Sequence, residues 1–287
     1  MITQQIRWML ISDPYFTVKH LNRAKNDQDS QKFLITQMCF REEIFSMYCC
    51  PLSLAQLVDE NVQKLKLDCL SNPKPTAHWK ILCLYDGLAV IRVTDTFDRD
   101  LSTVLLWNPS TRESMVLPLT EFSDQLIKYC FGLGYDSTSG EYKILRIYQD
   151  FNPFCCHRAK LPNEILTLTS GCCWRRIAEY PRRGICSLVW AMDFLAFLHM
   201  LHFIGSYGVE ESWMPLLTVD GSCFVDVKPK YMFPDGEVLY LFRASELSGS
   251  AFWTRNAGPF RLWPQCDNIG SVYSYTESLI SPKSLTY

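Results

Sequence analysis

Residues 104–117, Val-Leu-Leu-Trp-Asn-Pro-Ser-Thr-Arg-Glu-Ser-Met-Val-Leu, decide the fold of this chain. They place a polar tip between two apolar runs. Asn108 can accept a hydrogen bond from the backbone two residues further on, and Pro109 fixes φ for the first central position of a turn. The stretch therefore predicts a strand, a tight turn and a second strand.

The same pattern recurs on both sides of this stretch. Further pairs of apolar runs joined by short polar turns occur at residues 81–91, 131–147 and 164–177. From residue 104 onward the hairpins follow one another about every 30 residues, which is typical of arrays of antiparallel sheets such as the β-propeller. A blade takes about 40–45 residues, so residues 30–287 would supply about five to six blades. The sequence therefore predicts an all-β, propeller-like fold.

The glycines of these hairpins have separate expected roles. Gly140 is expected to adopt a positive φ because its turn reverses within a few residues, and Asp86-Gly87 predicts a sharp two-residue turn. Gly132 and Gly134 predict the close approach of a neighbouring strand or sheet. These two glycines also resemble part of a dinucleotide-binding fingerprint, but the third glycine and the following helix are missing. No nucleotide site is expected.

Several apolar side chains occupy strand positions beside the turns, and we expect them to be mostly buried. They are Leu105, Trp107, Leu133, Tyr135, Ile144, Leu166, Trp174, Trp213 and Val238. The three tryptophans allow two interpretations. They could form an aromatic rim that grips a partner peptide, or they could be packing anchors that recur because the blade recurs. The second interpretation is favoured.

Composition restricts the class of protein. The 287 residues are 48% hydrophobic, 20% charged and 14% aromatic, which is typical of a globular chain, and the formal net charge is -2. Because Lys and Arg are spread along the chain, no nucleic-acid partner is expected. The 13 cysteines follow no secretory signal. We therefore expect reduced, mostly buried thiols and a cytoplasmic or nuclear location.

No residues in the sequence indicate catalysis or metal binding. Cys155-Cys156-His157 and the pair His199 and His202 come nearest to metal ligands, but the paired Cys-x-x-Cys spacing of structural zinc is absent. No Gly-x-Ser-x-Gly nucleophile motif occurs. We expect no catalytic residue, no cofactor and no metal, and hence no enzyme. Arg175-Arg176 and Arg182-Arg183 could form a basic rim patch, although isolated arginine pairs are more often plain surface.

One segment is long and apolar enough to raise the question of a membrane. Residues 185–204 are almost wholly apolar and are interrupted by Asp193, His199 and His202. Asp193 near the centre would cost about 2.5–3.5 kcal/mol on insertion scales. The favoured interpretation is that this segment lies inside a soluble domain, so that no membrane partner is expected.

The order of these motifs resembles a known family. Trp107, Asn108, Pro109 and the following Ser-Thr-Arg, then Tyr135, Asp136 and Gly140 with a Tyr-Lys-Ile return, resemble the F-box-associated domain (type 1) of plant F-box proteins. Trp174 and Trp213 lie in further matching phrases, and the shared order extends over about residues 80–282. The S-locus F-box-like and F-box/kelch-like members are the most similar. The resemblance fades over residues 184–206, which leaves open that one blade is incomplete.

Residues 1–21 resemble a different unit, the C-terminal end of an F-box. The order Trp8, Leu10-Ile11, Ser12-Asp13-Pro14, Phe16 and His20-Leu21 carries this resemblance. The pattern predicts the end of one helix, a break, and a second helix that begins at Pro14 and is capped by Ser12 or Asp13. Residues 22–30 are polar and predict a linker, and residues 31–287 are assigned to the β domain.

The family implies a function. Its members are substrate-recognition subunits of SCF-type ubiquitin ligases, in which the F-box binds the adaptor Skp1 and the β domain binds a target protein. Here the Skp1-binding residues would be Trp8, Leu10, Ile11, Pro14 and Phe16. Because the sequence starts inside the F-box pattern, we expect Skp1 binding to be weak or absent in this form. The alternative is a binding module, or a decayed paralogue, that has lost Skp1 docking and ligase activity. The target protein is not evident.

Overall fold

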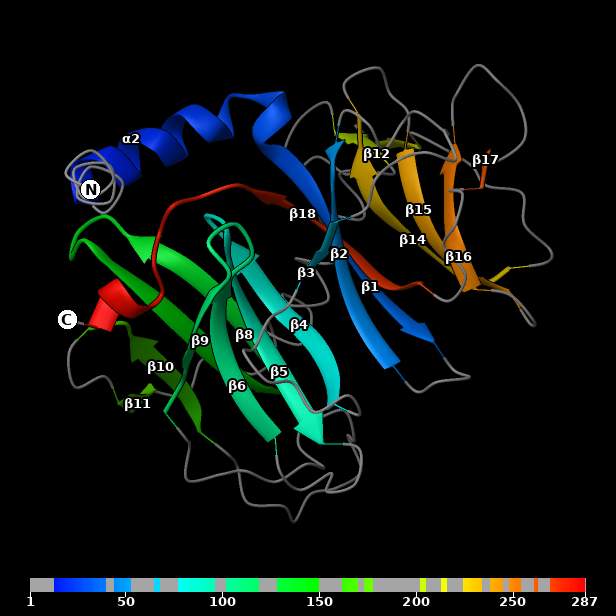
Figure 1. Cartoon of the computed structure of the whole chain (residues 1–287). Coiled ribbons are helices and arrows are strands. Elements are labelled where there is room, and N and C mark those ends of the chain that lie inside the picture. The colour runs from blue at the N-terminus through cyan, green and yellow to red at the C-terminus, as the bar shows by residue number, and fades with distance from the viewer. Residues whose placement is uncertain are drawn as a thin grey trace, which may run out of the picture.

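The structure is a computed structural model that describes only part of the chain. The described residues are 13–39, 44–52, 65–67, 77–95, 102–118, 128–149, 162–169, 173–177, 202–204, 213–215, 224–233, 238–244, 248–253, 261–262 and 269–286. Within these ranges the chain forms antiparallel strands, the helix α2 (Pro14–Lys25), and the short 3-10 helices η1 (Gln28–Ser30) and η3 (Lys283–Thr286). Figure 1 shows the strands in separate sheets with α2 across one end.

The first two sheets contain four strands each within the described ranges. The first has the order β18-β1-β2-β3 and contains β18 (Ile269–Thr276), β1 (Gln31–Cys39), β2 (Ile44–Pro51) and β3 (Leu65–Leu67). The second has the order β4-β5-β6-β7 and contains β4 (Ala77–Tyr85), β5 (Leu88–Asp95), β6 (Ser102–Asn108) and β7 (Glu113–Val116). Because β18 pairs with β1, the first sheet joins segments from both ends of the chain.

The remaining sheets follow in chain order. The third has the order β11-β10-β9-β8, with β8 (Lys128–Asp136), β9 (Glu141–Gln149), β10 (Asn163–Thr167) and β11 (Trp174–Ile177). A two-stranded sheet pairs β12 (His202–Ile204) with β13 (Trp213–Pro215). The last sheet contains β14 (Phe224–Met232), β15 (Val238–Ala244), β16 (Ser248–Trp253) and β17 (Arg261–Leu262).

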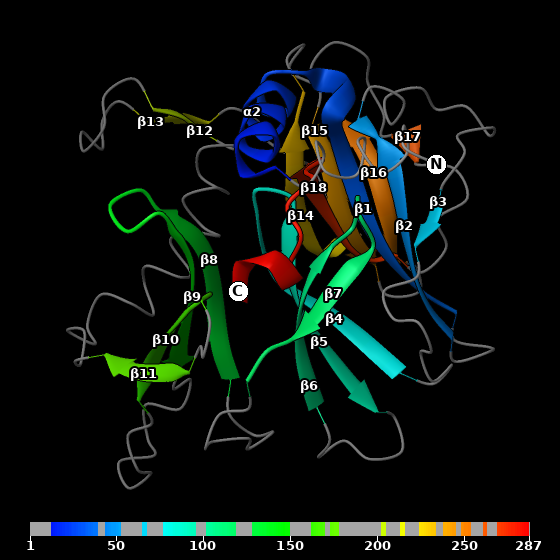
Figure 2. The same cartoon turned by 60° about the vertical axis from the view of Figure 1, so that its left-hand side comes forward.

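These sheets form the blades of a propeller-like fold. The strands β4, β8 and β14 each occupy the first edge of their sheet, and β18 occupies the corresponding edge of the first sheet. β4 packs against β8, and β14 packs against β18, so that these edge strands face one another. Figure 2 shows the sheets fanning out from this region. The predicted all-β, propeller-like fold is confirmed.

The hydrophobic core lies between neighbouring blades. In β5, Leu88 and Val90 pack with residues of the third sheet, whereas Ala89 and Ile91 pack with residues of the first sheet. Side chains alternate between the two faces of a strand, so a strand covered on both faces must be apolar throughout. The continuous apolar run 88–91 therefore follows from the central position of β5 between two blades.

Most of the predicted core residues are buried. Leu105, Trp107, Ile144, Leu166 and Val238 are each at most 2% exposed. Two more, Leu133 and Trp174, are half-buried.

The prediction is wrong for one residue and untested for another. Tyr135 is 46% exposed, because it lies at the end of β8 beside the turn, where the adjacent blade no longer covers the strand. The backbone of Trp213 is in β13, and its side chain lies outside the described residues.

The turns show which glycines the backbone requires. Gly140 has φ +73°, as predicted, and Asp86 and Gly87 have φ 51° and 76°, the pattern of a type I′ hairpin turn. The predicted close approach at Gly132 and Gly134 is wrong for the part of the chain that the structure describes. There, a Cβ at Gly134 would meet nothing within 4 Å, and one at Gly132 would reach only the Cβ of Leu145 at 4.0 Å.

The start of the described chain differs in one respect from the prediction. α2 begins at Pro14 as expected, but it continues to Lys25, and η1 follows at Gln28. The helix thus extends into residues predicted to be a linker. The reason is tertiary: Leu21 and Ala24 are buried on the β domain, which stabilises helix through the polar stretch.

The apolar segment 185–204 is described only at its end, where residues 202–204 form the strand β12. Within the described ranges, no helix has the length and hydropathy needed to cross a bilayer. The prediction for residues 185–201 lies outside the described residues.

Candidate interaction site

Helix α2 starts where the sequence predicts a cap. The side chain of Asp13 accepts a hydrogen bond from the backbone N–H of Phe16 at 3.1 Å, and Pro14 occupies the first turn, where its missing N–H costs nothing. The hydroxyl of Thr17 also donates to the Asp13 carbonyl at 3.0 Å. These contacts fix the point at which the chain enters the helix.

The outer face of α2 carries large apolar side chains. Tyr15 is 76% exposed, Phe16 42% and Val18 56%. The inner face is buried through Leu21 and Ala24. Exposed aromatic residues of this kind are enriched where proteins bind partners. Of the predicted Skp1-binding residues, Pro14 and Phe16 lie on this helix, whereas Trp8, Leu10 and Ile11 lie outside the described residues.

An ion pair joins the end of α2 to the hairpin turn of the second blade. Lys25 Nζ lies 2.6 Å from Asp86 Oδ1, and the carboxylate of Asp86 is only 8% exposed. The hydroxyl of Tyr142 donates to Asp86 Oδ2 at 3.1 Å, so that the same carboxylate joins the third blade as well. Burial, and secondarily the charge of Asp86, raise the pKa of Tyr142, which keeps its hydroxyl protonated as a donor. The helix is thus fixed to two blades.

The segment after β18 is packed beneath α2. Leu21 of the helix shares a core cluster with Leu88 and Ile280. The backbone N–H of Glu277 donates to the Ser30 carbonyl at 2.9 Å, and Gln31 Nε2 donates to the Ala24 carbonyl at 3.0 Å. Residues from both ends of the chain therefore hold the helix against the blades (Figure 1).

Asn108 connects this C-terminal segment to the turn that decides the fold. Its Nδ2 donates to the carbonyls of Ser278 and Ile280 at 3.0 and 2.8 Å, and its Oδ1 accepts from the N–H of Ser110 at 2.8 Å. Asn108 and Ser278 are both fully buried. The residues of this motif therefore lie in a closed hydrogen-bond network, with Pro109 buried in the turn itself.

The turn at Asp136 is exposed at the end of the third blade. Its carboxylate accepts hydrogen bonds from the N–H and hydroxyl of Thr138, the hydroxyl of Ser139 and the ammonium of Lys143. Lys143 and these donors hold the pKa of Asp136 well below its usual range. The Tyr135 ring packs against the Tyr142 ring, with the two centroids 5.0 Å apart. The turn thus presents an exposed tyrosine on an ordered support.

The tryptophans lie where packing would place them. Trp107 is fully buried between blades. Trp174 is half-buried, and its indole N–H donates to the Pro118 carbonyl at 3.0 Å, which links the third blade to the second. In this geometry neither ring forms part of an exposed aromatic rim. Trp213 allows no such comparison, because its side chain lies outside the described residues.

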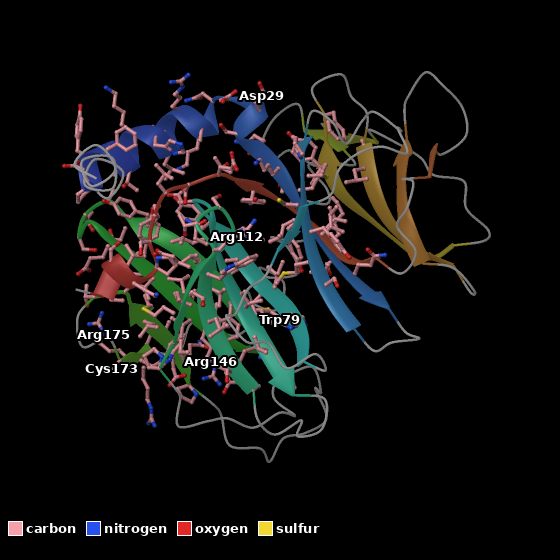
Figure 3. The ribbon with its side chains drawn as sticks, viewed as in Figure 1. Asp29, Trp79, Arg112, Arg146, Cys173 and Arg175 are labelled. Carbon is pink, nitrogen blue, oxygen red and sulfur yellow. The ribbon has the colours of Figure 1, made fainter. Side chains whose placement is uncertain are left out.

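A second polar cluster lies inside the interface between the second and third blades. Arg146 Nη1 is 3.3 Å from Glu164 Oε2, and both side chains are 6% exposed. The guanidinium carbon of Arg146 lies 3.5 Å from the centroid of the Tyr129 ring. Arg92 of β5 carries a buried Nε on the same interface. Figure 3 shows Arg146 toward the end of the blades that is opposite α2.

The structure adds little to the predicted absence of catalytic chemistry. In the part of the chain that the structure describes, no three His, Cys, Asp or Glu side chains are grouped to hold a metal ion. Cys155, Cys156, His157 and His199 lie outside that part. Burial raises the pKa of Cys83 to about 12, which leaves this thiol protonated and unreactive. Arg175 and Arg176 are exposed on β11.

These features define a class of protein: a propeller-like domain with a fixed helix and exposed aromatic side chains at one end, an arrangement suited to binding other proteins. Residues 53–190 match the family model described as the F-box associated beta propeller domain. The chain is also 24% identical over 152 residues to F-box protein At2g21930 of Arabidopsis thaliana. Together with the fold, these matches show that the chain is similar to plant F-box-associated proteins over about half of its length.

The match to the Arabidopsis protein covers 50% of this chain and 37% of that protein. The matched part of the chain therefore spans well under two thirds of the length of this relative. The type 1 and S-locus-like subgroups, and the assignment of residues 1–21 to an F-box, stay predictions.

The residues that fix α2 have no recognisable signal in the sequence. Asp86 is predicted only to lie in a turn and Lys25 only in a linker, because their ion pair joins positions far apart in the chain. Arg92 and Arg146 had a usable signal. Arg92 follows the buried residues 88 and 90 at alternate positions of β5, and Arg146 follows the buried residues 142 and 144 in β9. Strand periodicity therefore places each arginine on a core face.

Proposed function

We propose that this protein is a substrate-recognition subunit of an SCF-type ubiquitin ligase. The observation that carries the proposal is the F-box-associated domain match over residues 53–190, in a chain whose propeller-like domain holds a helix with an exposed apolar face. In this role the β domain binds a target protein and α2 forms part of the surface that binds a Skp1-like adaptor. The protein acts in the cytoplasm or the nucleus.

The subunit makes and breaks no bond in this scheme. It contributes proximity, because a target held on the β domain meets the ubiquitin-charged enzyme at a raised effective concentration. Proximity of this kind needs a defined geometry between the two binding surfaces. The Lys25–Asp86 ion pair, the Tyr142 hydrogen bond and the buried Leu21 supply it, because they leave α2 no free rotation relative to the blades.

Adaptor binding by variants of α2 tests the proposal. A double variant, Tyr15→Ser with Phe16→Ser, removes exposed apolar side chains without touching the buried face of the helix. Tyr135→Ser is the matched control, because Tyr135 is 46% exposed and Phe16 42%. A pull-down and titration with a plant Skp1-like adaptor should show weaker binding for the double variant and unchanged binding for the control.

Two outcomes would count against the proposal. Equal loss in the double variant and in Tyr135→Ser would mean that α2 is not the adaptor surface. No measurable binding of the adaptor, either to this chain or to the chain extended with a complete F-box, would favour the alternative of a binding module without a ligase link.

A further inference from the structure

The polar cluster between the second and third blades carries more positive than negative charge. Lys80, Arg92 and Arg146 lie on β4, β5 and β9, and Lys80 is the direct cross-strand partner of Arg92. Directly opposed residues of antiparallel strands project from the same face, so Lys80 and Arg92 share the face toward the third blade. Glu164 is the carboxylate paired with this cluster among the described residues.

The charge of Arg146 is paired. Its guanidinium pairs with Glu164 and lies over the Tyr129 ring, in a position that excludes most solvent. Such a buried pair is stable only because each charge has its partner. Arg146 is therefore the buried member of the cluster, and solvent or a ligand has little access to it.

Arg92 is more exposed than Arg146 and has no carboxylate partner among the described residues. Its Nε is buried and has no hydrogen-bond acceptor among the described residues, while its side chain as a whole is partly exposed. Burial, and then the charge of Arg146, lower the pKa of Arg92. A guanidinium that is partly removed from water and has no carboxylate partner is unfavourable, so an oxyanion bound at its accessible nitrogens would stabilise it.

The position of the cluster fits a role in target binding. The Asp86-Gly87 turn lies at the end of β5 that carries α2, and Arg92 is five residues further along the strand, or about 16 Å at the usual rise of a strand. The Arg146 side chain likewise lies toward the end opposite α2 (Figure 3). A ligand bound there would not compete with a partner bound on the helix.

We propose that Lys80, Arg92 and Arg146 form an oxyanion-binding site, in which the partly exposed Arg92 receives a carboxylate or phosphate group of a target protein. The planar fork of a guanidinium matches both groups in a bidentate geometry, and Lys80 adds a second mobile cation. This inference rests on the proposed function for the identity of the ligand-bearing partner, but the site itself is testable without the ligase.

The test is a titration of the full chain with inorganic phosphate and, separately, with acetate, observed through the Nε–H resonances of arginine side chains. Phosphate should shift the Arg92 resonance and saturate. Arg92→Gln should weaken phosphate binding at least about tenfold, which corresponds to about 1.4 kcal/mol. The control is Arg175→Gln, at an exposed arginine on β11, and its affinity should equal that of the parent chain.

The outcomes separate the sources of the ligand. Saturable binding of phosphate alone supports a phosphorylated target, and comparable binding of acetate supports an acidic one. Shifts that do not saturate, or that persist unchanged in Arg92→Gln, would overturn the site. Arg92→Lys gives a second measurement, because it keeps the charge but loses the fork and should bind with intermediate affinity. A positive result here with no adaptor binding would refute the ligase role alone.

Discussion

Replacing Gly87 by Ala tests how the closing segment is packed. The backbone at Gly87 has φ +76°, and an added Cβ would lie 2.5 Å from Ser278 Oγ, 2.6 Å from the Thr276 carbonyl oxygen and 2.7 Å from Ser278 Cβ. Ser278 is fully buried and is held by Asn108, so it has little room to move. The substitution therefore combines backbone strain with overpacking.

Gly140→Ala is the matched control, because it has the strain without the overpacking. Its φ is +73°, and the nearest atom to an added Cβ is the Tyr135 hydroxyl at 3.8 Å. A left-handed backbone costs a residue with a Cβ about 1–2 kcal/mol, and the stiffer unfolded chain returns about 0.4–1 kcal/mol, so Gly140→Ala should destabilise by about 1 kcal/mol. Overpacking adds about 1–3 kcal/mol at Gly87, which gives about 2–4 kcal/mol in total.

Urea unfolding of both variants, followed by tryptophan fluorescence, measures the two free energies of unfolding. Gly87→Ala should be less stable than Gly140→Ala by about 2 kcal/mol, which corresponds to a difference in Tm of about 4–8 °C for a domain of this class. Equal stabilities would refute the packing of the 276–280 segment against the Asp86-Gly87 turn. With that packing refuted, the fixed position of α2 would lose its main support.

Three further predictions concern individual side chains. Asn108→Ala removes the donors to the buried Ser278 and Ile280 carbonyls and should cost about 2–3 kcal/mol of unfolding free energy, whereas Thr103→Ala at an exposed position of the same strand should change it little. The pKa of Asp136 is lowered in the folded protein, so its carboxylate contributes fully to stability above its unfolded pKa of about 3.9, and this contribution is lost as the pH falls below that value. Asp136→Asn should therefore flatten the dependence of the unfolding free energy on pH on the acid side. An unchanged pH dependence would contradict the turn geometry. Cys83, with a pKa of about 12, should resist iodoacetamide at pH 8 in the folded protein while the exposed Cys173 is modified, as peptide mass spectrometry would show. Rapid labelling of Cys83 would contradict its raised pKa.

The hairpins could be predicted because their information is local. The Asn108-Pro109 and Asp86-Gly87 turns, and the positive φ of Gly140, depend on a few adjacent residues whose conformational preferences are known. Asp13 and Pro14 fix the start of α2 for the same reason.

The parts that could not be predicted depend on contacts between distant residues. Asn108 binds Ser278 and Ile280 about 170 positions later in the chain, and no local pattern in either segment specifies the other. The helix continues to Lys25 because Leu21 and Ala24 are buried on the β domain, and Tyr135 is exposed because the neighbouring blade ends short of it. Register and blade-to-blade packing decide these features, and turn chemistry alone carries no information about them.

The central claim, that this chain is the target-binding subunit of an SCF-type ligase, is tested most directly by titrating a plant Skp1-like adaptor against two forms. One form is the 287-residue chain, and the other is the same chain preceded by a complete F-box. An ordinary interface buries about 800 Å² on each partner, of which α2 offers only a part. The extended form should bind, and the 287-residue chain should bind at least about tenfold more weakly, a difference of about 1.4 kcal/mol or more. Equal affinities would show that the residues present suffice for docking, and an extended form that does not bind the adaptor would contradict the ligase role.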